Sequence, residues 1–589
     1  MINTLMKSVR EYKTPSILSP VLVSLEVVLE CIIPYIMARL IDEIYGGDMN
    51  VILLYGCILV GMAFLSLTCG VLAGRFCATA AVGLAKNLRH DLYDKVQSFS
   101  FANIDKFSSS GLVTRLTTDV NNLQNAYMMI IRIAVRCPFM LVFSLAMAIA
   151  VNAKMSIVFA VLIPLLGLAM YLLIRKVYPM FSRVFDQYDD VNNSVQENIK
   201  GIRVVKAYVR EEHEKKKFGD RAEELKRDFT KAETTIAWAN PIATFCMYVA
   251  VLVIAGLGSY LIIKTAGGVD ANGEPIWGEL STGGLSSLIT YSIQILSSLM
   301  ILSQILVGIA MSRASAERIA EVLETESEIK NPAEPLTEVA DGAVDFDGVS
   351  FKYAIDSERN ALQDIDLHIR SGETVGVIGG TGSGKSSLIQ LIPRLYDATT
   401  GTVRVGGRDV KEYDLTVLRD AVSVVLQKNE LFGGTVKENL RWGNEHATDE
   451  EIIAAAKAAE AHDFVSAMPD GYDSRIEQGG VNVSGGQKQR LCIARALLKK
   501  PKILIFDDST SAVDTATDFK IRAALKKAIP GTTKIIIAQR VASVMDADKI
   551  IVLDNGAIAA VGTHDELLSG CEIYREVYTT QTKAVQDEE

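Results

Sequence analysis

A glycine-rich stretch from Gly379 to Ser386 has the residue types and spacing of a phosphate-binding loop. The candidate ATP-binding residues in and beside it are Gly379, Gly380, Thr381, Gly382, Ser383, Gly384, Lys385, Ser386 and Ser387. A strand-like run precedes the loop and a helix-like run follows it, which is the context that this pattern requires. Backbone N–H groups would face a polyphosphate, Lys385 would reach its β- and γ-phosphates, and the Ser386 hydroxyl would bind Mg²⁺. The stretch therefore predicts a site for magnesium and ATP.

The composition of the chain predicts a membrane half and a soluble half. Its 589 residues are too many for one hydrophobic core, 49% of them are hydrophobic, and the apolar runs concentrate before Met311. A net charge of −10 argues against a nucleic-acid binder, because neutralising phosphates requires a basic surface. The eight cysteines form no C-x-x-C pair, so neither a disulfide framework nor a cysteine metal site is predicted.

Six apolar segments in the first half are long enough to span a membrane, which takes about 20 mostly apolar residues. They are Ile17–Ala38, Val51–Gly74, Ile133–Val151, Met155–Ile174, Pro241–Ile263 and Leu285–Met311. Most lysines and arginines of this half lie in 75–127 and 175–240, which the positive-inside rule places in the cytoplasm. The first segment is interpreted as a retained helix rather than a signal peptide. An even number of spans then returns the chain to the cytoplasm, where ATP is found.

Several charged and polar side chains fall inside these predicted spans. A charge there costs roughly 3 kcal/mol or more at the bilayer centre, so it normally faces a cavity or a partner. Glu26 and Glu30 share one face of the first helix, and Arg132 and Arg136 share one face near the third. The sixth helix carries a polar stripe of Thr290, Gln294, Ser297, Gln304 and Gly308. These groups either line a path for a substrate or form interhelical hydrogen bonds, and the sequence leaves both interpretations open.

The second half has the pattern of an α/β domain. A charged linker at 312–340 precedes a domain at 341–580, and a polar tail follows at 581–589. Strand signals occur at Gly342–Tyr353, Thr374–Ile378, Val422–Leu426, Ile503–Phe506, Lys534–Ile537 and Lys549–Leu553. Helical patterns separate most of them, which indicates a mainly parallel sheet. The expected fold is an all-α transmembrane domain of six helices, residues 1–311, followed by an α/β P-loop nucleotide-binding domain.

Further motifs give the chain a resemblance to a known family over nearly its whole length. They are Ser484-Gly485-Gly486-Gln487 at the start of a helix-like run, Ile503–Asp507, Gln427, Ser511–Asp514, Tyr353 before the phosphate loop, and the cytoplasmic runs Gly111–Leu116 and Gly201–Ala207. The sequence resembles an ATP-binding cassette (ABC) exporter, as a half-transporter that fuses one membrane domain to one nucleotide domain. Ser484 and the backbone N–H groups of Gly485 and Gly486, at the start of the helix-like run, would form a second anion site.

The resemblance implies a role for each motif. Tyr353 would stack on adenine, Gln427 would be the Q-loop glutamine, and Asp507 would be a magnesium-site carboxylate together with Ser386. Ser484, Gly485, Gly486 and Gln487 would form the signature that completes the ATP site of the opposite subunit, and Ser511 and Asp514 would belong to the D-loop. The runs Gly111–Leu116 and Gly201–Ala207 would be coupling-helix regions. A chain with one nucleotide domain would therefore work as a dimer.

Two positions depart from the family pattern, and both lie in the same ATP site. The family places a glutamate after Asp507 to orient the attacking water, and this chain has Asp508. Aspartate is one methylene shorter, and a misplacement of about 1 Å can cost on the order of a hundredfold in rate. The family's switch histidine is replaced by Gln539, whose amide donates hydrogen bonds but carries no charge and moves no proton. This chain's own catalytic pair is therefore expected to be impaired.

The intact signature beside an impaired catalytic pair favours a heterodimer over a slow homodimer. In a heterodimer the degenerate site, at this chain's phosphate loop, would retain ATP. The second site, formed by the partner's phosphate loop and this chain's signature, would hydrolyse ATP. The expected substrate is amphipathic, drug-like or lipid-like, and the expected location is a bacterial cytoplasmic membrane. A peptide exporter and an ATP-driven membrane regulator that transports no solute remain as alternatives. No N-terminal peptidase domain precedes the first span, which disfavours the peptidase-linked exporters.

Overall fold

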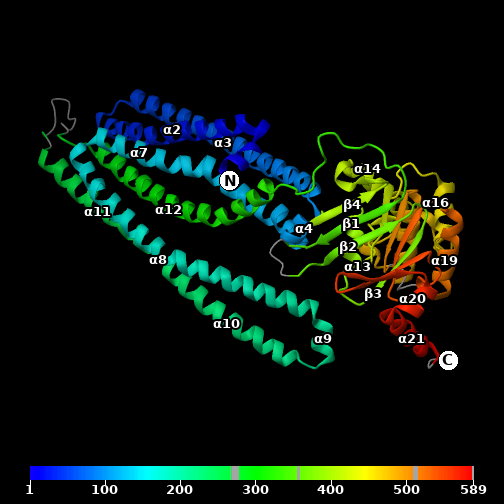
Figure 1. Cartoon of the computed structure of the whole chain (residues 1–589). Helices are drawn as coiled ribbons and strands as arrows, with labels where there is room; N and C mark the ends of the chain where they lie inside the picture. The colour runs from blue at the N-terminus through cyan, green and yellow to red at the C-terminus, as the bar shows by residue number, and fades with distance from the viewer. Residues whose placement is uncertain (266, 268–277, 355–358, 509–514, 587–589) are drawn as a thin grey trace. The chain divides into compact units, whose positions relative to one another are not determined.

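The structure is a computed structural model that describes all residues except 266, 268–277, 355–358, 509–514 and 587–589 (Figure 1). It divides into two compact units, and the chain enters the second unit twice. The helical unit consists of Met1–Gln97 and Ser109–Thr325, and the nucleotide-binding unit consists of Ser98–Ser108 and Glu326–Glu589.

Long helices make up the first unit. Its main helices are α2 (Lys13–Gly46), α3 (Met49–Gln97), α7 (Ala134–Val151), α8 (Ala153–Lys200), α10 (Glu211–Ile236), α11 (Ala239–Thr265) and α12 (Thr282–Glu324). Within the described part of the chain, six helical stretches are long and apolar enough to cross a membrane. This confirms the prediction of six spanning helices, and the protein is an integral membrane protein. Lipid tails offer no hydrogen-bond partners to backbone N–H and C=O groups. An α-helix can cross the membrane because it satisfies these groups internally.

Small residues and aromatic side chains pack these helices together. Tyr291 of α12 is fully buried, and its hydroxyl donates to the carbonyl oxygen of Cys31 on α2 at 2.7 Å. The same core includes Phe159 of α8 and Ile254 of α11. Because lipid tails are as apolar as these side chains, close packing and interhelical hydrogen bonds hold such helices together rather than a hydrophobic gain.

Two predicted boundaries differ from the structure. The linker predicted at 312–340 begins as helix, because α12 continues to Glu324. Its charged residues form a solvated face instead of a coil, as in the ion pair between Arg313 and Glu317 at 2.8 Å. Similarly, the segment predicted as a polar tail from 581 belongs to the helix α21 (Glu572–Gln586).

A six-stranded sheet forms the centre of the second unit. Its order is β12-β11-β3-β10-β9-β6, and every pair is parallel except the antiparallel pair of β11 with β12. The strands are β3 (Thr374–Gly379), β6 (Val422–Val425), β9 (Ile503–Asp507), β10 (Thr533–Ile537), β11 (Lys549–Asp554) and β12 (Ala557–Gly562). All residues of β9 and β10 are buried. Ligands of parallel sheets bind at the carboxyl ends of the strands, which fixes where the ATP site must lie.

A second, antiparallel sheet covers part of the first. Its order is β2-β1-β4-β5, with β1 (Val344–Phe351), β2 (Leu362–Ile369), β4 (Thr400–Val405) and β5 (Arg408–Asp409). Alternate side chains of the central strands face two cores: Ile505 packs with the antiparallel sheet and α13 (Lys385–Leu391), whereas Leu504 packs with α18 (Gly485–Leu498). This alternation is the period of two of a β-strand.

Candidate functional site

The phosphate loop lies between β3 and α13, as its sequence context predicts. β3 ends at Gly379 and α13 begins at Lys385. Gly384 has φ +96°, and a Cβ at this residue would lie 2.7 Å from the carbonyl oxygen of Ala361. A residue with a side chain would therefore have to move a neighbouring backbone segment, so glycine is required here. The helix N-terminus that follows supplies N–H groups and a partial positive charge to an anion.

Lys385 folds back over this loop. Its Nζ atom donates to the carbonyl oxygens of Gly379 and Gly380, both at 2.8 Å. Burial lowers the pKa of the lysine from its ordinary value, and the nearby carboxylates of Asp508 and Asp507 oppose this. Burial makes the charged form of Lys385 less favourable. A bound phosphate, which is anionic, would offset this cost.

Ser386 and Asp507 form the part of the site that fits magnesium. The Ser386 hydroxyl donates to Asp507 Oδ1 at 3.0 Å, so a hydroxyl and a carboxylate converge from α13 and the end of β9. Burial raises the pKa of Asp507, and the hydrogen bond from Ser386 lowers it. Mg²⁺ prefers oxygen ligands and usually takes one or two from protein and the rest from phosphates and water. Among the described residues, no group of three or more His, Cys, Asp or Glu side chains is placed to hold a metal ion.

Asp508 is held by two glutamine side chains. Gln539 Nε2 donates to Asp508 Oδ2 at 2.6 Å, and Gln427 Nε2 donates to the same oxygen at 3.3 Å. Asp508 directly follows β9, has φ +48° and is 8% exposed. The structure therefore brings together the two departures from the family pattern and the predicted Q-loop glutamine. Gln427 contacts Asp508, and a magnesium role for it remains a proposal.

Tyr353 stands in an aromatic cluster beside the loop. Its hydroxyl forms hydrogen bonds with Ser387 Oγ at 2.9 Å and Gln390 Oε1 at 3.1 Å. Its ring packs edge-on against Tyr396, with ring centroids 5.2 Å apart. Half of Tyr353 is exposed, so it can offer a ring surface to a base.

A contact from a distant segment reaches this cluster, and the sequence did not indicate it. The Tyr396 hydroxyl donates to Asp105 Oδ2 at 2.7 Å, and Asp105 lies on α4 (Phe101–Phe107), which belongs to the nucleotide-binding unit. Phe101 of the same helix lies 6.1 Å from the Tyr396 ring. Burial raises the pKa of Tyr396, and the hydrogen bond to Asp105 raises it further.

The segment predicted as the first coupling-helix region is part of the helical unit. Gly111–Leu116 belongs to the helical unit, where Arg115 forms an ion pair with Glu321 of α12 at 2.8 Å. The neighbouring segment Ser98–Ser108 is grouped with the nucleotide-binding unit. The second predicted region contains the short helix α9 (Ile202–Ala207), beside which Tyr208 and Val209 are strongly exposed.

The signature residues begin α18 with reciprocal capping hydrogen bonds. Gln487 N donates to Ser484 Oγ at 3.3 Å, and Ser484 N donates to Gln487 Oε1 at 2.9 Å. Ser484 and Gly485 are exposed. Such a capped N-terminus presents its remaining N–H groups to solvent, so it can bind an anion supplied from outside the unit. The predicted D-loop residues Ser511 and Asp514 lie outside the described residues.

A second residue that the sequence did not indicate is Gln581 of α21. Its Nε2 atom donates to the carbonyl oxygen of Gln539 at 2.8 Å, and its Oε1 atom accepts from Val541 N at 2.8 Å. One amide side chain thus holds the backbone on both sides of Arg540. It fixes the segment that carries Gln539, whose side chain contacts Asp508.

We expect Gln581→Leu to release ATP from the Lys385 site up to about 30-fold faster, because two hydrogen bonds of about 1 kcal/mol each are lost. The measurement is the dissociation rate of labelled ATP from the purified protein. Thr582→Leu is the matched control, since this neighbour is exposed and its hydroxyl contacts only its own helix. An unchanged rate in the Gln581 variant would show that the segment is held by other contacts.

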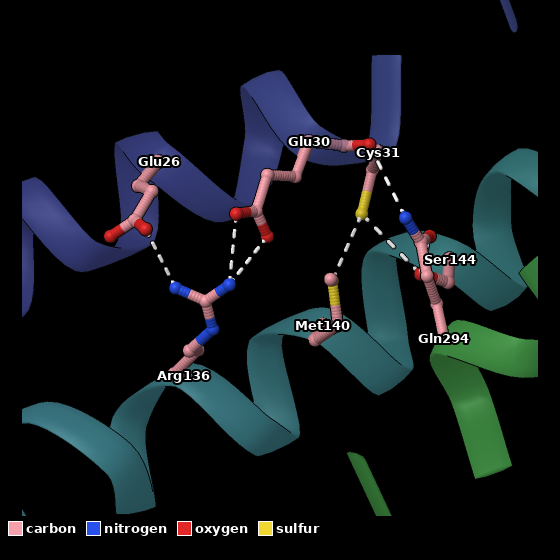
Figure 2. A network of polar contacts seen from close by, with 7 residues as sticks. All are labelled: Glu26, Glu30, Cys31, Arg136, Met140, Ser144 and Gln294. Carbon is pink, nitrogen blue, oxygen red and sulfur yellow. Dashed lines mark hydrogen bonds and ion pairs between the residues drawn. The ribbon is translucent and has the colours of Figure 1, made fainter. Parts of the chain in front are cut away.

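A network of charged and polar side chains joins three membrane helices (Figure 2). Arg136 of α7 contacts Glu26 Oε1 at 2.7 Å and both carboxylate oxygens of Glu30 at 2.7 and 2.8 Å, with both glutamates on α2. Gln294 of α12 joins through Ser144, whose hydroxyl donates to Gln294 Oε1 at 3.0 Å, and through the carbonyl oxygen of Glu30. The network brings together Glu26, Glu30, Arg136 and Gln294 of the predicted substrate-path residues.

The other two predicted path residues lie outside this network. Arg132 is half-buried and lines a cavity together with Glu26 and Glu30. Gln304 is exposed, and the described residues give it no hydrogen bond to the network. Four of the six residues thus take part in hydrogen bonds between helices, although Glu26 Oε2 is left without a partner among the described residues.

Comparison with known proteins identifies the family of both halves. The family model for the ABC transporter transmembrane region matches residues 16–299, and that for the ABC transporter matches 362–511. The uncharacterized ABC transporter ATP-binding protein YfiB of Bacillus subtilis is 35% identical over 562 residues, which cover 95% of each chain. YgaD of the same organism, whose name proposes multidrug export, is 32% identical over 507 residues and covers 84% of this chain and 83% of its own.

A solved structure shows the same architecture. The structure described as a bacterial Atm1-family ABC exporter with ATP bound has a TM-score of 0.79 to this chain, covers 98% of this chain and 99% of its own, and is 23% identical. This likeness concerns the fold, and it agrees with the six helices followed by an α/β domain described above. Together with the relatives, these observations place this chain in the ABC transporter family, as an exporter-type half-transporter whose transmembrane region and ATP-binding domain form one polypeptide.

Proposed function

We propose that this chain is the hydrolysis-impaired subunit of a heterodimeric ABC exporter in a bacterial cytoplasmic membrane. It binds ATP and Mg²⁺ at the Lys385 site, and it lends the Ser484 signature to a catalytic site on a second half-transporter. Two amide donors occupy one oxygen of Asp508, and this observation carries the proposal. A water molecule would compete with both amides for a carboxylate that is already one methylene short.

The residues around Asp508 bind and orient nucleotide but offer no proton path. Magnesium, once bound with ATP, would neutralise phosphate charge between Ser386 and Asp507. Lys385 would hold the β- and γ-phosphates, and Tyr353 would stack on the base. Gln539 would hold Asp508 in place, and its neutral amide accepts no proton from the attacking water. The site is therefore suited to retain ATP and to hold two nucleotide domains closed.

Transport follows from the preference of ATP for the closed dimer. ATP that binds the closed arrangement more tightly shifts the membrane helices from inward- to outward-facing, and hydrolysis at the partner's site resets them. Tyr208 and Val209, two adjacent exposed apolar residues that follow α9, are available for contact with a partner chain. The exposed signature supports a second half-transporter as this partner.

The test of the impaired site is Asp508→Asn in the assembled exporter. We expect the ATPase rate to change by less than about twofold, because Asp508 contributes little to turnover. The exposed Asp420→Asn is a matched control for the same chemical change. A collapse of activity in the Asp508 variant, with the control active, would show that Asp508 is the working catalytic carboxylate.

The partner itself gives a second readout. A tagged chain isolated from its native membrane should carry a second polypeptide of similar size in equal amount. That polypeptide should have glutamate and histidine at the positions equivalent to Asp508 and Gln539. A homodimer that transports at full rate would contradict the proposed unequal pair.

A further inference from the structure

A cavity lies among the membrane helices next to the charged network. It has a volume of about 480 Å³ and is lined by Glu26, Glu30, Ser66, Leu67, Gly70, Val71, Gly74 and Arg132. These residues come from α2, α3 and the helical turn Met129–Ile133. The volume is in the range of small-molecule sites. Charged residues at membrane depth are costly and commonly mark a ligand path, so this cavity is a candidate ligand site.

One charge in the cavity is a carboxylate with an unused oxygen. Glu26 is 8% exposed, and its Oε1 atom contacts Arg136 at 2.7 Å (Figure 2). Its Oε2 atom is buried and has no hydrogen-bond partner in the described chain. Glu30, in contrast, uses both oxygens on Arg136. A buried oxygen without a donor keeps the cost of its desolvation, which a bound donor would offset.

A second charged group of interest in the cavity is the guanidinium of Arg132. Within the described residues, Arg132 has no hydrogen bond or ion pair, although it lines the same cavity as two glutamates. Glycines of α3 give both charged groups their space: a Cβ at Gly70 would lie 3.0 Å from Glu26 Oε1, and one at Gly74 would lie 3.3 Å from Arg132 Nη1. Gly70 and Gly74 are about 6 Å apart along the helix, so the unused oxygen and the free guanidinium are separated by about one turn.

The charge balance of this cavity selects one class of ligand. Glu26, Glu30 and Arg132 line the cavity, and Arg136 pairs with both glutamates beside it, so the formal charges of these four groups sum to zero. A bound cation would leave Arg132 unpaired, and a bound anion would leave Glu26 Oε2 without a donor. A zwitterion satisfies both groups and adds no net charge to the low-dielectric interior.

We propose that this cavity binds a zwitterionic head group, with its ammonium on Glu26 and its anionic group on Arg132. Leu67 and Val71 line the same cavity and are 61% and 62% exposed on α3, so an acyl chain can extend along them into lipid. The ligand class is thus an amphiphile with an ammonium and a phosphate separated by a short bridge. The identification of this cavity as a transport site depends on the proposed exporter function, whereas the binding chemistry stands alone.

The experiment measures lipid retention in the absence of ATP. The purified full-length exporter is placed in nanodiscs of phosphatidylglycerol with equal shares of phosphatidylethanolamine and a cationic lipid without phosphate. Retained lipids are then counted by native mass spectrometry after mild delipidation. We expect the zwitterionic lipid to be retained at least about tenfold over the other two. Equal retention of the three lipids would overturn the proposal, and this comparison needs no variant.

Variants then locate the binding groups. Glu26→Gln and Arg132→Gln should each lower retention of the zwitterionic lipid about tenfold, because each removes one of the two charges. Lys154→Gln is the control, since Lys154 forms an exposed ion pair with Glu279 outside the cavity. Unchanged retention in both cavity variants, with ATP binding intact as evidence of folding, would overturn the assignment.

Water-soluble phosphoethanolamine, added as a competitor, identifies the source of the head group. If it displaces the lipid only at great excess, the ligand is a membrane amphiphile, and if it competes at equal concentration, the ligand is a soluble zwitterion with the same chemistry. Both outcomes support the zwitterion site. A failure of the exporter function would instead appear as absent ATP-driven transport with lipid selectivity retained.

Discussion

Ser484→Arg is expected to lower the ATPase rate of the assembled exporter by on the order of a hundredfold, whereas Asp508→Asn leaves it nearly unchanged. Ser484 caps α18 and is exposed, so in the proposed dimer it would present the N–H groups of this helix start to the nucleotide of the second subunit. Arginine would remove the cap and fill the space of the phosphate. The more damaging substitution is thus the one that lies outside this chain's own ATP site.

The measurement is steady-state ATP hydrolysis together with photolabelling of the Lys385 site by an azido-ATP. Labelling should persist in the Ser484 variant, which shows that its nucleotide-binding unit is folded. Ser569→Arg is the matched control, because it places the same side chain on an exposed serine of α20 (His564–Gly570). Full activity in the Ser484 variant would mean that this signature completes no working site.

The double variant Asp508→Glu with Gln539→His should raise hydrolysis at this chain's own site by on the order of a hundredfold. Glutamate restores the missing methylene, which moves the carboxylate toward the water that it must orient. Histidine restores a ring that titrates near neutral pH. Both changes are needed, because Gln539 and Asp508 contact each other at 2.6 Å and changing one alone leaves the other unmatched.

Copies of this chain assembled without its partner give the clearest assay, since both sites are then of the same kind. The wild-type assembly should hydrolyse ATP slowly and the double variant briskly, measured by phosphate release. Each single variant serves as a control for the pair. Brisk hydrolysis by the wild-type assembly would contradict the impaired site directly.

The positions of the candidate ATP-site residues on strands and helices could be predicted, because these residues belong to short, contiguous motifs. Lys385, Ser386, Asp507 and Ser484 lie at the strand and helix ends where those motifs place them. The strands β2 and β4 were missed, because one face of each is partly exposed and their alternating polarity resembles loop sequence. The parallel strands, buried on both faces, gave continuous apolar runs that were easier to recognise.

Contacts between distant segments could not be predicted in this way. Asp105 and Tyr396 are 291 residues apart, and Gln581 and Gln539 are 42 apart, and neither pair belongs to a local pattern. The pairing of the charged residues within the membrane helices could not be predicted either. Helical spacing placed Glu26 and Glu30 on one face, but it gave no reason for Arg136 rather than Arg132 to pair with both.

The helix α4 has a consequence for any attempt to produce the ATP-binding portion as a separate recombinant fragment. A fragment that starts at Glu326 would omit residues that complete its own tertiary structure, because Ser98–Ser108 belongs to that unit. Tyr396 would lose its acceptor, and Phe101 would no longer shield its ring. Kinetic constants from such a truncated protein would then describe an ATP site with an uncovered aromatic wall, so the intact polypeptide is the right material for enzymology.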